Sequence, residues 1–367
     1  MSRVAPAAPV PGAVPDFAAR VVAWQRHAGR HGLPWQASRD PYRVWLSEIM
    51  LQQTQVTTVL AYYARFLERF PGVAALAAAS LDDVLAAWSG LGYYSRARNL
   101  HRCAKVLMTE HAGRFPSDAE QLSTLPGIGR STAAAIAAFC FDQRAAILDG
   151  NVKRVLTRAL GFSDDLAVAA HERSLWQRAC ALLPQDALDM PAYTQGLMDL
   201  GATVCLVRRP NCLACPLDEV CAARRQGRPE AYPVKTRKLR RTRRENWWLW
   251  LECADGVWLQ QRPSAGVWAG LWSLPMFDSE AALDAAALAM GTRAEVRPVV
   301  RHALTHFDWT LHPRRALIGS LTIAQDVPRV MGAGRWVELD ALPTLGVPAP
   351  LSKLLGAASA RATSAPA

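Results

Sequence analysis

Apolar residues recur at three- and four-residue spacing from residue 17 to about residue 204, between short breaks rich in Gly, Pro and Asp. This period puts apolar side chains on one face of a helix, so we expect an almost wholly helical region. In "SRDPYRVWLSEIMLQQTQV", Asp40 is a candidate N-cap and Pro41 takes the first helical position before a long apolar face. The pattern therefore predicts a helix that starts near Pro41.

The pattern changes beyond residue 223. Residues 224–244 carry ten basic residues, one acid and two prolines without an apolar period, which indicates an exposed linker. "WWLWLECADGVWLQQR" then contains two strand-like runs joined at Asp255-Gly256, a dipeptide suited to a tight hairpin. Eight of the thirteen tryptophans follow Asn246, and their strand spacing favours the core over base stacking. A second domain of mixed α and β structure is expected from Asn246.

Length and composition set the protein class. A chain of 367 residues exceeds the size of one hydrophobic core, so we expect two domains. With 51% hydrophobic and 20% charged residues the chain is globular, and no apolar run spans a bilayer. The first residues lack a signal pattern, so we expect a cytoplasmic protein with loose tails at 1–16 and 358–367. The net charge of +11 is compatible with a polyanionic partner.

Four cysteines lie within seventeen residues, with the spacing Cys-x6-Cys-x2-Cys-x5-Cys: Cys205, Cys212, Cys215 and Cys221. Four thiolates this close can surround one cluster or ion, and the spacing alone does not separate an iron–sulfur cluster from a structural zinc. The other four cysteines stand singly in apolar surroundings, where we expect core packing: Cys103, Cys140, Cys180 and Cys253.

The segment "LPGIGRSTAAAIAAF", from Leu125 to Phe139, predicts a hairpin between two helices. Gly127 and Gly129 allow a tight turn and a close approach of the backbone to a partner. The helix that follows begins with unpaired N–H groups, which suit a phosphate. On this segment alone, a simple packing turn between helices remains the alternative.

Two carboxyl groups are candidates for chemistry. Glu48 lies in "VWLSEIML", where apolar surroundings penalise ionisation and favour a proton donor; pairing with a basic residue is the alternative. Asp149 follows the apolar run "AAIL" and precedes "GNVKRV", which makes it a candidate N-cap. The same position at a helix N-terminus favours the anion. One neutral and one anionic carboxyl are what glycosidic bond cleavage requires.

Several segments, in this order, resemble adenine DNA glycosylases of the MutY type, in the endonuclease III superfamily: "LPWQASRDPYRVWLSEIMLQQTQV", "GLGYYSRARNL", "LPGIGRSTAAAI", "ILDGNVKRV", "MDLGATVC" and the four-cysteine loop. The resemblance runs from about Leu33 to Cys221 and continues more weakly to about residue 357. It implies a mainly α N-terminal domain at 17–226, formed by a six-helix barrel, a helix-hairpin-helix at 125–132 and an iron–sulfur module at 205–221. A basic linker at 227–245 and an α+β Nudix-like domain at 246–357 would follow.

The resemblance also implies a reaction and its residues. A monomeric enzyme would remove adenine mispaired with 8-oxoguanine, or with guanine, from double-stranded DNA after flipping the base. Glu48 would protonate the adenine ring, and Asp149 would stabilise the positive charge on the sugar or bond to it briefly. A 4Fe-4S cluster on the four clustered cysteines would fix a loop with Arg208 and Arg209. By the family motifs, the base pocket would contain Trp35, Leu46 and Gln195, and the opened base stack would be met by Gln52 and Tyr93. The hairpin residues that would contact DNA are Gly127, Gly129 and Ser131, and Asn151 would lie beside Asp149.

Three departures refine this picture. Ser131 stands where bifunctional relatives carry a lysine, so a monofunctional enzyme using water is expected. After Gly270 the glutamates of a magnesium-binding Nudix motif are missing, so the second domain should bind and not hydrolyse. The lesion-reading loop, Phe-Ser-His in relatives, is here Leu304-Thr305-His306, which keeps a hydroxyl and an imidazole. The alternatives are a bifunctional lyase, a non-catalytic DNA-binding protein, and nucleotide hydrolysis by residues 246–357.

Overall fold

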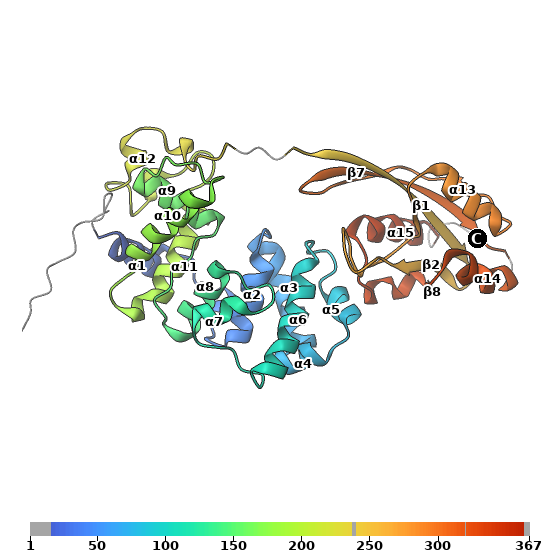
Figure 1. The fold of residues 1–367 in the computed structure, drawn as a ribbon, viewed down its shortest axis with the longest axis horizontal. Coiled ribbons are helices and arrows are strands. Elements are labelled where there is room, and N and C mark those ends of the chain that lie inside the picture. The colour runs from blue at the N-terminus through green and yellow to red at the C-terminus, as the bar shows by residue number, and fades with distance from the viewer. Residues whose placement is uncertain (1–15, 237–239, 320, 363–367) are drawn as a thin grey trace, which may run out of the picture. The chain divides into compact units, whose positions relative to one another are not determined.

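The structure, a computed structural model, describes residues 16–236, 240–319 and 321–362 (Figure 1). The described residues form two compact units, one drawn from 16–52 and 106–236, the other from 53–105, 240–319 and 321–362. No helix in the described ranges is long and apolar enough to cross a membrane.

The first unit is helical, as the apolar period predicts. Its α-helices are α1 (Phe17–Ala28), α2 (Pro41–Leu51), α7 (Ala119–Thr124), α8 (Arg130–Phe141), α9 (Gly150–Leu160), α10 (Ala169–Ala181), α11 (Met190–Asp199) and α12 (Ala222–Arg225). Short 3-10 turns lie at η1 (Pro34–Gln36), η2 (Ala187–Asp189), η4 (Cys212–Ala214) and η5 (Pro229–Ala231), and a π-helical turn at η3 (Leu200–Val204).

Local caps define where these helices begin. The Asp40 carboxylate accepts from the Tyr42 amide and Pro41 opens α2, which confirms the predicted helix start. α7 and α8 flank the turn at 125–129, which confirms the helix-hairpin-helix. In that turn Gly127 has φ +79°, and Gly129 is the N-cap of α8.

The core of the first unit lies between α1, α8, α9 and α11, with buried side chains such as Val21, Leu156 and Tyr193. α1 packs on α11, and α2 packs on α8. The α1–α11 approach needs Gly196, because a Cβ there would lie 2.8 Å from Cγ1 of Val21. This packing places the loop between α1 and α2 beside α11.

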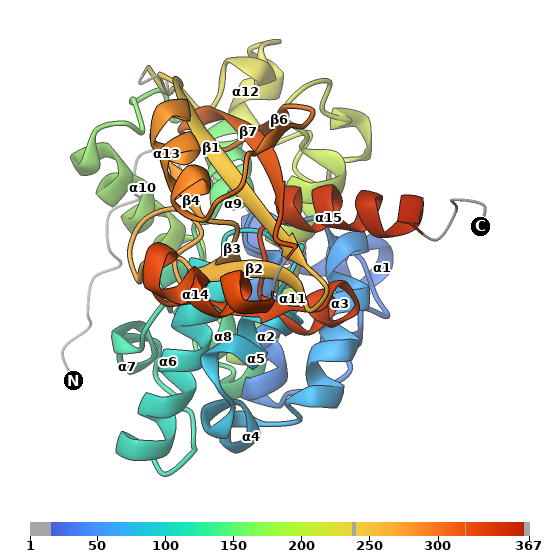
Figure 2. The same ribbon diagram turned by 90° about the vertical axis from the view of Figure 1, so that its right-hand side faces the viewer.

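The second unit joins four helices to a sheet domain (Figures 1 and 2). The helices are α3 (Val56–Arg69), α4 (Val73–Ala78), α5 (Leu81–Ala87) and α6 (Ser95–Glu110), of which α6 continues into the first unit. The sheet domain contains β1 (Thr242–Cys253), β2 (Gly256–Gln261), β3 (Trp272–Ser273), β4 (Met276–Phe277), α13 (Glu280–Ala289), β5 (Glu295–Val296), β6 (Val300–Ala303), β7 (Phe307–Leu317), α14 (Leu321–Met331), β8 (Arg335–Val337), η6 (Leu339–Thr344) and α15 (Ala349–Ala362).

The sheet has the order β3-β2-β1-β7-β5, with β4 on β1, β6 on β7 and β8 on β2. β1 and β7 run parallel along their whole length, from Thr242 opposite Phe307 to Glu252 opposite Leu317. The expected hairpin is confirmed between β1 and β2, with its turn one residue early, because Gly256 pairs with Cys253. Only glycine fits there, because φ is +118° and a Cβ would lie 2.1 Å from the Val337 carbonyl oxygen.

Five of the eight C-terminal tryptophans are buried, which confirms their predicted core role: Trp248, Trp250, Trp258, Trp268 and Trp309. Trp268 stacks on Trp309 with ring centroids 4.5 Å apart. These rings fill the space beside the strands, so they do not present free stacking faces.

The boundary between the units differs from the expected domains, because α3 to α5 and most of α6 group with the sheet domain. The Asp82 carboxylate, on α5, accepts hydrogen bonds from Trp272 Nε1 at 3.2 Å and Gln261 Nε2 at 3.0 Å. Arg98 donates to the Ala269 carbonyl at 2.8 Å. The division into 17–226 and 246–357 therefore remains a prediction about which parts fold independently.

Two sequence expectations need correction. The stretch 227–245 is not simply an exposed linker, because Tyr232 is buried and its carbonyl accepts a hydrogen bond from Arg158 Nε. The strand β1 also begins within this stretch, at Thr242. Residues 237–239 lie outside the described ranges. Cys103 is buried, but Cys140 and Cys253 are half-buried and Cys180 is exposed. Cys180 follows the buried Ala179, one helical step of about 100° further round α10, which turns it to solvent. At the C-terminal end, α15 extends to Ala362, into the expected tail.

Candidate active site

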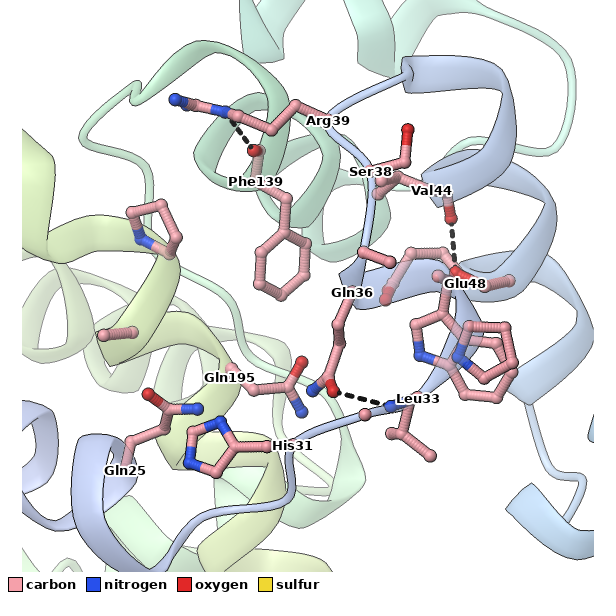
Figure 3. Close-up of a pocket in the computed structure, with 17 residues that line it drawn as sticks. Gln25, His31, Leu33, Gln36, Ser38, Arg39, Val44, Glu48, Phe139 and Gln195 are labelled. Atoms are coloured by element: carbon pink, nitrogen blue, oxygen red, sulfur yellow. Dashed lines mark hydrogen bonds between the residues drawn. The ribbon is translucent and has the colours of Figure 1, made fainter.

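A cavity of about 560 Å³ opens in the first unit (Figure 3). This volume lies within the range of about 300–1,000 Å³ typical of small-molecule sites. One wall is the loop between α1 and α2, from His31 to Arg39; α1, α2, α8 and α11 supply the rest. The other lining residues are Gln25, Val44, Ser47, Glu48, Phe139, Pro191, Ala192 and Gln195.

Glu48 is the acidic residue of this lining. Burial, as the larger cause, and the charge of Asp149 together raise the pKa of its carboxyl from 4.5 to about 8. Within the described residues the carboxyl accepts no hydrogen bond and forms no ion pair, so the alternative of a paired buried glutamate does not apply. Glu48 is therefore protonated at neutral pH and can donate a proton into the cavity.

Asp149 is the N-cap of α9, as predicted. One oxygen, Oδ1, accepts from the Val152 amide at 2.8 Å, and the N-terminal end of the helix dipole favours the anion. The preceding residue is held from the hairpin, because the Leu148 amide donates to Ser131 Oγ at 3.0 Å. Asp149 does not line the cavity itself; its charge is the second cause, after burial, of the raised pKa of Glu48.

The predicted pocket residues divide into two groups. Trp35 and Gln195 line the cavity, whereas Leu46 is fully buried and does not. Leu46 lies two positions before Glu48 on α2, about 200° round the helix, so its side chain packs into the core.

Gln195 belongs to a network that the sequence did not indicate. Its Nε2 donates to Oδ1 of Asp199 at 2.8 Å. The Asp199 carboxylate, 1% exposed, also binds the backbone amide of Arg30 at 2.8 Å and its Nε at 2.7 Å. The only sequence signal was the four-residue spacing of Gln195 and Asp199, which puts both on one face of α11.

The other predicted residues of the first unit lie around the hairpin and α9. Gln52 donates to Thr132 Oγ1 at 3.4 Å, which ties the end of α2 to the start of α8. Asn151 Oδ1 accepts from Arg154 at 2.9 Å, and Arg154 also donates to the Cys205 carbonyl at 2.7 Å. α9 thus contacts the cysteine loop as well as carrying Asp149.

The second unit brings together two predicted DNA-contacting residues from distant segments. Leu304, Thr305 and His306 form the tip of the β6–β7 hairpin, where Thr305 and His306 are exposed. Thr305 Oγ1 lies 3.2 Å from the hydroxyl of Tyr93, whose side chain is 46% exposed. Tyr93 has φ +47°, a conformation that costs a tyrosine free energy and is held by its surroundings.

The four clustered cysteines line one small cavity of about 20 Å³. Arg158 lies beside it and donates to Cys205 Sγ at 3.3 Å and to the carbonyls of Leu206 and Val207 at 2.7 and 3.1 Å. In the described ranges no three His, Cys, Asp or Glu side chains converge on a single-ion site. The four cysteines thus share one cavity.

Known families match both halves of the sequence. Residues 46–179 match the HhH-GPD superfamily of base excision DNA repair proteins, and residues 246–357 match the NUDIX domain. Adenine DNA glycosylase of Buchnera aphidicola subsp. Baizongia pistaciae is 33% identical over 347 residues, which cover 92% of this chain and 95% of that protein. The Homo sapiens adenine DNA glycosylase is 40% identical over 222 residues, 58% of this chain and 40% of that protein.

A solved structure supports the helical part. A thermostable thymine-DNA glycosylase superposes with a TM-score of 0.51 at 26% identity, and the match covers 57% of this chain and 95% of that one. The helical architecture of the HhH-GPD region and the α+β character of the C-terminal part are both as predicted.

The protonation of Glu48 predicts a pH-dependent effect on stability. The pKa in the folded state, about 8, exceeds the ordinary value of 4.5, so the folded protein holds an extra proton across this window and loses stability as pH rises through it. Glu48→Gln removes this loss and should raise the free energy of unfolding relative to wild type by on the order of 4 kcal/mol at about pH 8.5, with little difference near about pH 5. Urea unfolding at both pH values measures it.

Glu68→Gln, at an exposed position, is the matched control and should differ little from wild type in its free energy of unfolding at either pH. If the free energy of unfolding of Glu48→Gln relative to wild type is the same at both pH values, Glu48 is not held neutral in the folded protein.

Proposed function

This chain belongs to the adenine DNA glycosylase family, and we propose that it hydrolyses the bond between deoxyribose and adenine mispaired with 8-oxoguanine or guanine in double-stranded DNA. It is an enzyme of base excision repair. The observation that carries the specific reaction is the neutral Glu48 on the cavity wall near the anionic Asp149. We further propose that it acts as a monomer in the cytoplasm.

Glu48 supplies the proton. Adenine leaves poorly as an anion, and protonation of a ring nitrogen turns it into a neutral leaving group. The raised pKa of about 8 keeps the acid loaded at neutral pH. The electrons of the breaking bond go to the protonated base.

Asp149 acts on the sugar side. As the bond breaks, positive charge develops on the deoxyribose, and a carboxylate at a helix N-terminus can stabilise it or bond to it briefly. Water then adds to the sugar carbon and gives up a proton, so the products are free adenine and an abasic site. Capping of α9 by Asp149 fixes the carboxylate before the reaction starts.

Ser131 supports a monofunctional reaction. A lyase needs an amine that attacks the sugar and forms a Schiff base. Ser131 offers a hydroxyl, which already accepts a hydrogen bond from the Leu148 amide. Strand cleavage is therefore left to another enzyme.

Several features support DNA as the partner. The target adenine is out of reach inside a duplex, so the base flips into the cavity. The N-terminus of α8 after Gly129 suits a backbone phosphate. Tyr93 and the adjacent Thr305, with His306, would meet the opened stack and the opposite 8-oxoguanine.

The four-cysteine site fits a 4Fe-4S cluster, which would be held by Cys205, Cys212, Cys215 and Cys221 around their shared cavity. Bound there, the cluster would have a structural role and hold the loop together through its bonds to the four thiolates. The chain itself braces the loop through Arg158, which would leave Arg208 and Arg209 placed for phosphates without a large loss of chain entropy.

The sheet domain is proposed to bind and not to hydrolyse. The glutamate positions of the magnesium motif are occupied by residues on β4 and α13 that include Met276 and Leu288. Neither side chain is an oxygen ligand for magnesium.

We expect Asp149→Asn and Glu48→Gln each to slow single-turnover adenine release by about 100-fold or more, because each removes one of the two charge-handling groups. The assay uses a duplex with adenine opposite 8-oxoguanine, and alkali reveals the abasic sites. Duplex binding at fixed salt should change little.

Asp118→Asn is the matched control, because Asp118 caps α7 as Asp149 caps α9. It should leave the rate near that of wild type. Adenine release by Asp149→Asn at the wild-type rate would refute the mechanism.

The cluster assignment predicts about four irons per chain and a brown protein with broad visible absorption. Cys212→Ser should lower the iron content, whereas Cys180→Ser, at an exposed cysteine outside the set, should not. Elemental analysis provides the measurement. One zinc and no iron would contradict the assignment.

A further inference from the structure

The cavity wall contains an amide whose two ends are not equivalent. Gln195 presents a carbonyl oxygen and an NH2 group, and either could face a ligand. Asp199 decides between them, because a carboxylate only accepts hydrogen bonds and therefore takes the Nε2 end at 2.8 Å. The planar amide then directs its Oε1 away from Asp199, toward the cavity that Gln195 lines (Figure 3).

Arg30 in turn fixes Asp199. Its backbone amide and Nε bind the two carboxylate oxygens at 2.8 and 2.7 Å, and Asp199 is buried. Arg30 immediately precedes the wall segment 31–39. The same carboxylate therefore orients the amide on α11 and anchors the facing loop.

We infer that Asp199, held by Arg30, is a positioning residue that makes Gln195 a hydrogen-bond acceptor in the cavity and thereby selects a base with an exocyclic amino group. The inference rests on the proposed function, because adenine has to occupy this cavity. Adenine offers an amino donor, whereas hypoxanthine offers a carbonyl oxygen at the same place. Two facing acceptors repel, so hypoxanthine is rejected and unsubstituted purine only loses a contact.

Asp199→Asn reverses this polarity without changing the size of the side chain. Gln195 Nε2 shares Oδ1 with the Arg30 guanidinium, whereas the Arg30 backbone amide binds Oδ2. The backbone amide cannot move and holds the asparagine oxygen at the Oδ2 position, so the asparagine NH2 takes the Oδ1 position beside Gln195, and the Arg30 side chain, 31% exposed, turns to solvent. The Gln195 oxygen then pairs with that NH2, and the Gln195 NH2 turns to the cavity. Discrimination by a well-placed hydrogen bond is commonly tenfold or more.

The test compares single-turnover release of adenine, hypoxanthine and purine, each opposite 8-oxoguanine in one duplex sequence, by the full-length protein. We expect Asp199→Asn to lower the adenine-to-hypoxanthine rate ratio by about tenfold or more and to change purine release least. Asp189→Asn is the matched control, because Asp189 pairs with Arg26 at 2.6 Å beside the same helix and has no contact with Gln195; its ratio should stay near that of wild type.

Gln195→Met separates positioning from a general structural effect. Gln195→Met should lower the adenine-to-hypoxanthine rate ratio by itself. In the Gln195→Met background, Asp199→Asn should not lower this ratio further. An equal slowing of all three bases by Asp199→Asn, or an unchanged ratio in Gln195→Met, would overturn the inference; the second result does so even if Asp199→Asn does not fold. A wild-type protein that releases no adenine refutes the proposed function as well, whereas unchanged ratios in an active protein refute only the positioning role.

Discussion

The withdrawal of one carboxyl from water is the constraint on which the site depends. Glu48 lies in an apolar helix face at the cavity wall, and no donor in the described residues compensates its charge, so the neutral form is favoured. The charge of Asp149, which accepts a hydrogen bond from the Val152 amide at the start of α9, adds to this effect. One carboxyl is thus kept as an acid by its surroundings, and the other caps the start of a helix.

The surrounding fold holds this arrangement from several sides. Ser131 ties the helix-hairpin-helix to the residue before Asp149, Arg154 joins the same helix to the cysteine loop, and Asp199 joins α11 to the loop that forms the opposite wall. These connections are side chain to backbone or involve a buried charge, and such contacts hold geometry better than apolar packing alone. A site that handles charge therefore rests on a rigid polar framework. The hairpin tip that carries Thr305 and His306 rests in the same way on Tyr93 within its own unit.

Local chemistry made much of this predictable from the sequence. The caps at Asp40 and Asp149, the turn at Gly127 and the β1–β2 hairpin are each specified by a few neighbouring residues, and all are present. Long-range packing was not readable. Arg30 and Asp199 are separated by 169 positions, Leu46 points away from the cavity despite its place beside Glu48, Tyr232 is buried within an apparently polar linker, and Cys180 faces solvent. Each depends on which helix face meets a distant segment, and that information is absent from a local pattern.

The pH dependence of adenine release tests the central claim most directly, because the reaction needs Glu48 protonated. The single-turnover rate of the wild-type protein, measured on a duplex with adenine opposite 8-oxoguanine, should hold through neutral pH and fall as pH rises through about 8. A rate that already falls between about pH 4 and pH 5, near the ordinary pKa of a glutamate, would show that Glu48 is an ordinary exposed carboxyl and would contradict the account.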